Sequence, residues 1–247
     1  MSLGLPEKPA LDLLAPDADP QAQAAPFTRV LVRAGARDLA EHWASRPPQE
    51  TDPAGWRLPD RWFEADHRIV VGTRALDAVH TPGHTPGHYV FADEGAGLLF
   101  AGDHVLPTIT PSIGFTVPPV PDPLGDFMAS LTRVRSLPDL TILPAHGPVA
   151  PSSHTRVDEL TAHHEDRLRN SLAGLDHGAQ TAHEVAQQLT WTRHERSYTE
   201  LDEFSQGLAT METKAHLDLL VARGAATAVE GPDGTVFSQR PTAPPAG

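Results

Sequence analysis

The sequence predicts an α/β protein made of a strand-rich domain followed by a smaller helical domain. Three observations carry this prediction. From Ile69 onward, short apolar runs alternate with turns and then with a helical pattern; after Pro151 the pattern becomes helical; and 247 residues suffice for one medium domain with a smaller partner. The predicted boundaries are a lead-in at 1–26, a first domain at 27–150, a second at 151–240 and a flexible tail at 241–247.

The lead-in at 1–26 is expected to be poorly ordered because prolines interrupt it repeatedly. They stand at Pro6, Pro9, Pro16, Pro20 and Pro26. Residues 27–43 then predict a helix, since several of their apolar side chains recur at helical spacing. Further prolines from Pro47 onward end that helix.

Four short apolar runs predict consecutive β-strands, and a helix and a fifth strand follow them. The strands are expected at 69–71, 76–79, 89–92 and 98–101. Residues 124–137 repeat apolar side chains on one helical face, and 140–143 form another apolar run. This part of the chain therefore predicts a strand, helix, strand alternation.

The segment 151–240 predicts three helices and a terminal hairpin. The first helix is expected near 157–175, and a capping box of Thr181 and Glu184 opens a short second helix through Leu189. The third is expected at 201–223, and Pro232-Asp-Gly234 is a turn between two strand-like arms. Three helices followed by a hairpin have a winged-helix topology.

The composition of the chain argues against some classes of binding partner and limits the possible metal ligands. The net charge of -13 opposes binding to phosphate backbones and anionic bilayers, so nucleic acid is an unlikely partner. No apolar run approaches the roughly 20 residues of a membrane helix, and no signal-peptide pattern opens the chain, so a cytoplasmic protein is expected. Because the chain has no cysteine, any metal ligands must be His, Asp or Glu.

Three strings at predicted strand ends carry imidazoles and a carboxylate. They are His80-Thr-Pro-Gly-His84-Thr-Pro-Gly-His88, Gly102-Asp103-His104 and Pro144-Ala-His146-Gly147. Glycine after an apolar strand allows a sharp turn, which brings Asp103 out at the carboxyl end. Its two oxygens can bridge two cations, and a zinc-bound water with a pKa near 7 would be the nucleophile.

These strings resemble the metallo-β-lactamase fold of metal-dependent hydrolases, which includes glyoxalase II type thioesterases. The resemblance implies an αββα sandwich, with His84, Asp103 and His146 matching the third, fourth and fifth ligand motifs. It implies His84 and His146 as terminal ligands and Asp103 as the bridging, catalytic carboxylate between two ions. Zinc is expected, and manganese or iron would suit the same donors. The predicted winged helix is similar to the domain appended in one lactamase-like subgroup.

The chain departs from the family pattern at its start. No His-x-His-x-Asp-His string occurs, so the sandwich is expected to be N-terminally incomplete and each ion would keep two protein ligands. Two are fewer than the three or four usual at zinc sites, which puts the activity of this chain in question. An incomplete sandwich also exposes one sheet face, and a homo-oligomer could cover it.

The predicted function is a hydrolase that acts on a small ester or thioester through metal-activated water. The alternative is a catalytically impaired relic or binding module, and a nuclease or nucleic-acid binder is a third. His80 and His88 either support the metal ligands or simply pack, and His104 either lines the substrate entrance or is structural. Residues 110–114 are either a pocket-lining loop or a solvated connector.

Overall fold

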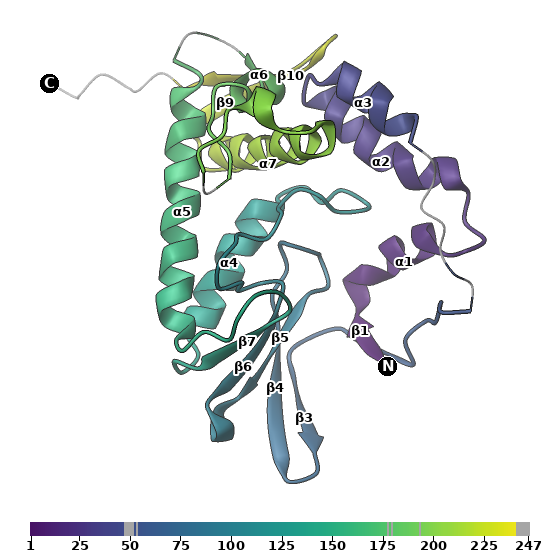
Figure 1. Ribbon diagram of the computed structural model, residues 1–247, viewed down its shortest axis with the longest axis vertical. Helices are drawn as coiled ribbons and strands as arrows, with labels where there is room; N and C mark the ends of the chain where they lie inside the picture. Colours follow the sequence, from purple (N-terminus) through teal and green to yellow (C-terminus); the bar gives the residue numbers. More distant parts are fainter. Residues whose placement is uncertain (47–51, 53, 177, 179, 193, 241–247) are drawn as a thin grey trace, which may run out of the picture. The chain divides into compact units, whose positions relative to one another are not determined.

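The computed structural model describes residues 1–46, 52, 54–176, 178, 180–192 and 194–240 (Figure 1). The chain forms two compact units, Met1–Pro26 with Pro47–His164 and Phe27–Arg46 with Glu165–Gly247. The predicted boundaries at 27 and 151 differ from this division. Residues 27–46 join the second unit because Trp43 stacks on Phe204 with ring centroids 5.1 Å apart. The predicted tail at 241–247 lies outside the described residues.

The N-terminal residues form regular structure, so the expectation of a poorly ordered lead-in is corrected. Their elements are β1 (Ser2–Gly4), the 3₁₀ helix η1 (Leu5–Glu7), α1 (Lys8–Leu14) and α2 (Pro20–Arg33). Pro6 and Pro9 lie in the first turns of η1 and α1, where the backbone N–H has no helical partner to lose. The helix expected at 27–43 is two helices, because Gly35 with φ +85° breaks the chain before α3 (Arg37–Ala44).

A five-stranded sheet is the centre of the first unit. Its strands are β3 (His67–Val71), β4 (Arg74–His80), β5 (Tyr89–Asp93), β6 (Leu98–Gly102) and β7 (Thr141–Pro144), in that spatial order. Neighbours are antiparallel except β6 and β7, which are parallel and joined through α4 (Pro123–Arg135). The short 3₁₀ helix η2 (Glu94–Ala96) connects β5 to β6. These elements confirm the predicted strand, helix, strand alternation.

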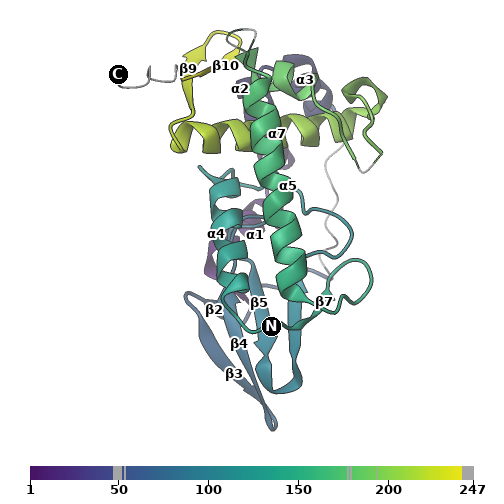
Figure 2. The same cartoon turned by 90° about the vertical axis from the view of Figure 1, so that its left-hand side faces the viewer.

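The two faces of this sheet differ in burial. Val90, Ala92, Leu99, Ala101 and Ile142 point to one face and are fully buried. Helix α4 and the first half of α5 (Ser153–Ala173) lie beside the sheet in both views (Figures 1 and 2).

The opposite face keeps part of its apolar surface in solvent. The register places Phe91, Phe100 and Leu143 side by side on it, and Phe100 is 38% exposed. Within the described residues the first unit adds to this sheet only the parallel pair β1 and β2 (Arg61–Phe63), so a second large sheet is not part of it.

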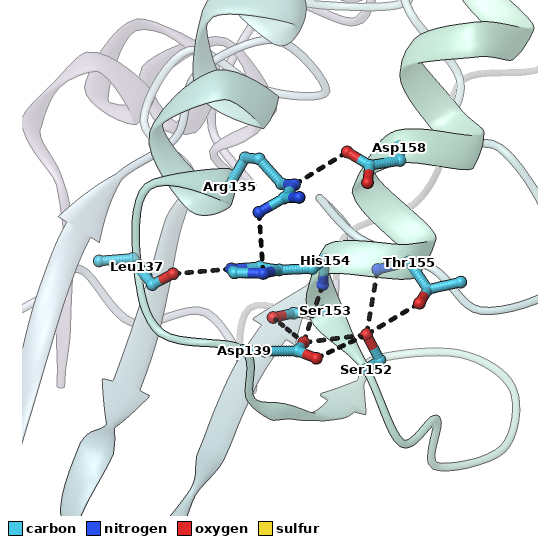
Figure 3. A network of polar contacts seen from close by, with 8 residues as sticks. All are labelled: Arg135, Leu137, Asp139, Ser152, Ser153, His154, Thr155 and Asp158. Atoms are coloured by element: carbon cyan, nitrogen blue, oxygen red, sulfur yellow. Dashed lines mark hydrogen bonds and ion pairs between the residues drawn. The ribbon is translucent and has the colours of Figure 1, made fainter.

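A polar network fastens the start of α5 to the turn before β7 (Figure 3). The Asp139 carboxylate accepts hydrogen bonds from the Ser152 hydroxyl at 2.9 Å and from the His154 amide at 3.0 Å. The His154 ring donates from Nε2 to the carbonyl of Leu137 at 2.7 Å. These bonds satisfy donors at the first turn of the helix and fix its direction relative to β7.

The second unit contains the C-terminal helices and a three-stranded sheet. Strand β8 (Gln180–Thr181), α6 (Ala182–Ala186), the 3₁₀ helix η3 (Tyr198–Glu200) and α7 (Glu203–Ala222) precede the hairpin of β9 (Ala226–Gly231) and β10 (Gly234–Gln239). The sheet has the order β8-β10-β9. The capping box of Thr181 and Glu184 is confirmed. Among the described residues, no helix has the length and apolar character needed to cross a membrane.

Candidate active site

The carboxyl ends of β6 and β7 bring two of the predicted site residues together. The strands are parallel neighbours, and the Ala145 amide donates to the Gly102 carbonyl at 2.9 Å just beyond them. As a result Asp103 Oδ1 lies 3.4 Å from His146 Nε2. The side chain of His146 is 70% exposed and that of Asp103 is 32% exposed, so solvent reaches both groups.

His84 lies in the loop of residues 81–88, which we call the His84 loop. The Thr81 amide donates to the His88 carbonyl at 2.8 Å and closes the loop at its base. The ring of His84 donates from Nδ1 to the carbonyl of Ser112 at 2.9 Å. This bond leaves Nε2 as the nitrogen with a free lone pair in the neutral ring. Ser112 therefore orients His84, which is a role for the 110–114 loop that the sequence left open.

His88 connects the His84 loop to the strand end that carries Asp103. Its Nε2 accepts a hydrogen bond from the Asp103 amide at 3.1 Å, so Nδ1 carries the proton and donates to the Thr81 hydroxyl at 2.9 Å. The pKa of His88 is lowered to about 4, chiefly by burial and next by the charge of His84, while the charge of Asp103 opposes the shift. A neutral His88 can therefore accept the hydrogen bond that holds the Asp103 backbone amide.

His80 bonds within its own loop, and His104 packs against Phe127. The His80 ring donates from Nε2 to the carbonyl of Pro86 at 2.9 Å, a bond within the same loop. His104 is fully buried with its ring 4.9 Å from that of Phe127, and burial lowers its pKa to about 3. The hypothesis that His104 lines a substrate entrance is therefore wrong, because a side chain without exposed surface cannot contact an entering molecule.

The donor chemistry of this region suits a metal ion, but its arrangement does not form a complete site. In the part of the chain that the structure describes, no three His, Asp or Glu side chains are grouped to hold an ion. The pair of Asp103 and His146 provides fewer protein ligands than structural or catalytic zinc sites use. Asp103 and His146 are therefore at most part of the ligand set of an ion.

Comparison with known sequences identifies the relatives of this chain. The model of the metallo-beta-lactamase superfamily matches residues 22–146, half of the chain. The lactamase-like protein adaB of Aspergillus niger is 36% identical over 121 residues, which are 48% of this chain and 36% of that protein. The probable metallo-hydrolase YqjP of Bacillus subtilis is 27% identical over 162 residues, 64% of this chain and 48% of YqjP. The chain thus spans between a third and a half of these relatives.

Solved structures agree with the sequence matches. A metallo-beta-lactamase family protein from Thermus thermophilus superposes with a TM-score of 0.72 at 27% identity, covering 97% of this chain and 71% of that one. A beta-lactamase domain protein from Burkholderia ambifaria superposes with a TM-score of 0.68 at 27% identity, covering 84% of this chain and 61% of that one. With half of its length matched by the family model and its fold shared with these structures, the chain belongs to the metallo-beta-lactamase superfamily.

Proposed function

We propose that the protein is a hydrolase of a small ester or thioester and that its reaction takes place at Asp103 and His146. The observation that carries this proposal is the placement of a carboxylate and an imidazole 3.4 Å apart at adjacent strand ends, open to solvent. Membership of a superfamily that contains metallo-hydrolases supports the reaction class.

The chain's own groups suit the handling of water beside an acyl group. An ionised Asp103 can accept a hydrogen bond from a water molecule, and the neighbouring imidazole of His146 can accept or donate a proton at Nε2. In ester or thioester hydrolysis that water adds to the acyl carbon, and the alcohol or thiol leaves with a proton.

Zinc is the ion that we propose for this protein, since the superfamily typically binds metal ions and imidazole and carboxylate ligands suit zinc. Manganese and iron accept the same ligands, so metal analysis has to separate the three. We propose His84 as a third ligand because the bond to Ser112 leaves its Nε2 available, although the described residues do not group it with Asp103 and His146. For the second unit we propose a winged-helix assignment, supported by the order α5, β8, α6, α7 and hairpin.

The proposal is tested by metal content and hydrolysis in the parent protein and in Asp103→Ala. Protein purified in the presence of zinc, manganese and iron is analysed by mass spectrometry and assayed with a p-nitrophenyl ester and an acyl thioester. We expect Asp103→Ala to lose the metal and to lower kcat/KM by about 100-fold, the lower range for a proton-transfer group. Asp77→Ala, on strand β4, is the control and should change neither. Absence of both metal and hydrolysis in the parent would contradict the proposal.

A further inference from the structure

The N-terminal arm, residues 2–7, contacts the His84 loop directly. A carboxylate oxygen of Glu7, Oε1, accepts hydrogen bonds from the Thr85 hydroxyl and from the Gly87 amide, the latter at 2.9 Å. Backbone also meets backbone, since a Cβ placed on Gly4 would overlap the carbonyl oxygen of Gly87. Side chain and main chain of the arm therefore both reach the residues that follow His84.

The arm is itself anchored within the first unit. Its strand β1 pairs in parallel with β2, with Leu3 opposite Trp62, and the amino terminus of Met1 pairs with Asp60. Helix η1, which ends at Glu7, follows directly on β1. The pairing of β1 with β2 therefore fixes the position of Glu7 beside the His84 loop. The backbone of the arm is thus held by β2, and the carboxylate of Glu7 is bonded to the His84 loop.

The His84 loop needs such support because its own backbone makes few bonds. Besides closure at its base, the Gly83 amide donates to the Thr85 carbonyl at 3.2 Å, the Ser130 hydroxyl donates to the Pro82 carbonyl at 2.8 Å and the His80 ring donates to the Pro86 carbonyl. Those bonds use loop carbonyls. The donors of Thr85 and Gly87 are both satisfied by the single oxygen of Glu7, which is the acceptor chemistry that an ionised carboxylate supplies best.

We propose that Glu7 is a positioning residue for His84: its carboxylate fixes residues 85–87 and thereby holds the imidazole in the orientation in which Nδ1 meets the Ser112 carbonyl. Its meaning for chemistry rests on the proposed function, in which His84 belongs to the site. The N-terminal arm then forms part of the site and is not a lead-in to it.

The test compares Glu7→Ala with Glu7→Gln in the full chain, without added metal or substrate, by NMR. We expect Glu7→Ala to accelerate hydrogen exchange of the Gly87 amide at least about tenfold, because the bond to a charged acceptor is lost. We also expect the ring nitrogen resonances of His84 to shift away from the single Nδ1–H tautomer. Glu7→Gln keeps an oxygen acceptor and should restore most of both readouts. Glu200→Ala is the matched control, because Glu200 accepts from the Ser197 hydroxyl and amide in the second unit.

Two outcomes would overturn the proposal. Unchanged Gly87 exchange in Glu7→Ala would show that the carboxylate does not hold the loop, and faster exchange with unchanged His84 resonances would reduce Glu7 to a purely structural contact. If Glu7→Ala does not fold, Thr85→Val removes one of the two bonds from the loop side and should shift the same His84 resonances. Since these readouts use neither metal nor turnover, they can succeed even if the assays for hydrolysis fail.

Discussion

At the scale of single residues, Gly102 decides how Asp103 leaves strand β6. Its φ of +52° lies in the left-handed region, and a Cβ there would lie 2.5 Å from His88 Nε2. The same nitrogen accepts the hydrogen bond of the Asp103 amide. Gly102 therefore provides both the turn and the space in which the neutral ring of His88 supports Asp103.

Strand β6 offers a matched pair of glycines for testing this. Gly97, just before the strand, has φ +68° and no atom within 4 Å of the point that a Cβ would occupy, so Gly97→Ala reports the backbone cost alone, about 1–2 kcal/mol. Gly102→Ala should cost that amount plus about 1–3 kcal/mol for displacing His88 from the Asp103 amide. Urea unfolding measures both variants. Equal losses would show that the His88 contact contributes nothing.

At the scale of elements, α3 and the part of α2 from Phe27 onward belong to the second unit although they precede the sheet in the chain. The Ala34 carbonyl accepts from the His183 amide at 2.8 Å, and a Cβ on Gly207 would lie 2.5 Å from the Trp43 ring. Helix α6 in turn meets α7 and η3 through His183, whose Nδ1 lies 3.2 Å from the Tyr198 hydroxyl and 3.3 Å from that of Thr210. Packing of elements distant in sequence defines this unit.

The half-buried ring of His183 makes the second unit sensitive to acid. Burial lowers the pKa of His183 below its ordinary value of 6.5, and the carboxylates of Glu184 and Asp38 oppose that shift without cancelling it. In the unfolded chain the imidazole of His183 therefore takes up a proton near pH 6.5, whereas in the folded chain it takes up that proton only at lower pH. Stability is complete above pH 6.5 and declines as the pH falls from 6.5 to the folded pKa.

Urea midpoints between pH 8 and pH 5 measure this decline in the parent and in His183→Gln. The variant has no titrating ring at this position, so its midpoint should fall less over the same range. His42→Gln, in the same unit and with a side chain that is 40% exposed, is the control and should retain the full decline. A parental midpoint that is independent of pH would contradict this prediction.

At the scale of the whole molecule, the half-exposed sheet face sets the protein apart from a fully covered α/β domain. Phe91, Phe100 and Leu143 lie side by side on it, whereas the apolar side chains at the centre of the opposite face are fully buried. Adjoining apolar side chains in water form a patch of the kind that binds dyes and partners. The net charge of -13 opposes association of copies through it.

The exposed face predicts binding of the dye ANS by the native protein. We expect Phe100→Ser to lower ANS fluorescence with little loss of stability, because the phenyl ring is 38% exposed. Val229→Ser is the control, since Val229 is 69% exposed on the hairpin of the other unit and should leave the fluorescence unchanged. Native protein that binds no ANS would show that this face is covered in solution.

The sequence by itself determined the strands of the five-stranded sheet and the C-terminal hairpin, the helices α4 to α7 and the positions of Asp103 and His146 at strand ends. Apolar spacing, glycine and capping residues act over a few residues, so these features can be read from neighbours in the chain. Pairing of β6 with β7 then follows from adjacent apolar strands joined by a helix, and it brings Asp103 to His146.

Only the tertiary structure decided which distant groups support the site. The bonds from Glu7 to Thr85, from His84 to Ser112 and from His88 to the Asp103 amide join residues that no short-range pattern relates. The order of the N-terminal arm, the burial of His104 and the place of residues 27–46 were likewise set by long-range packing. Such contacts depend on how whole elements fill space together, and that balance is not written in the spacing of residues along one segment.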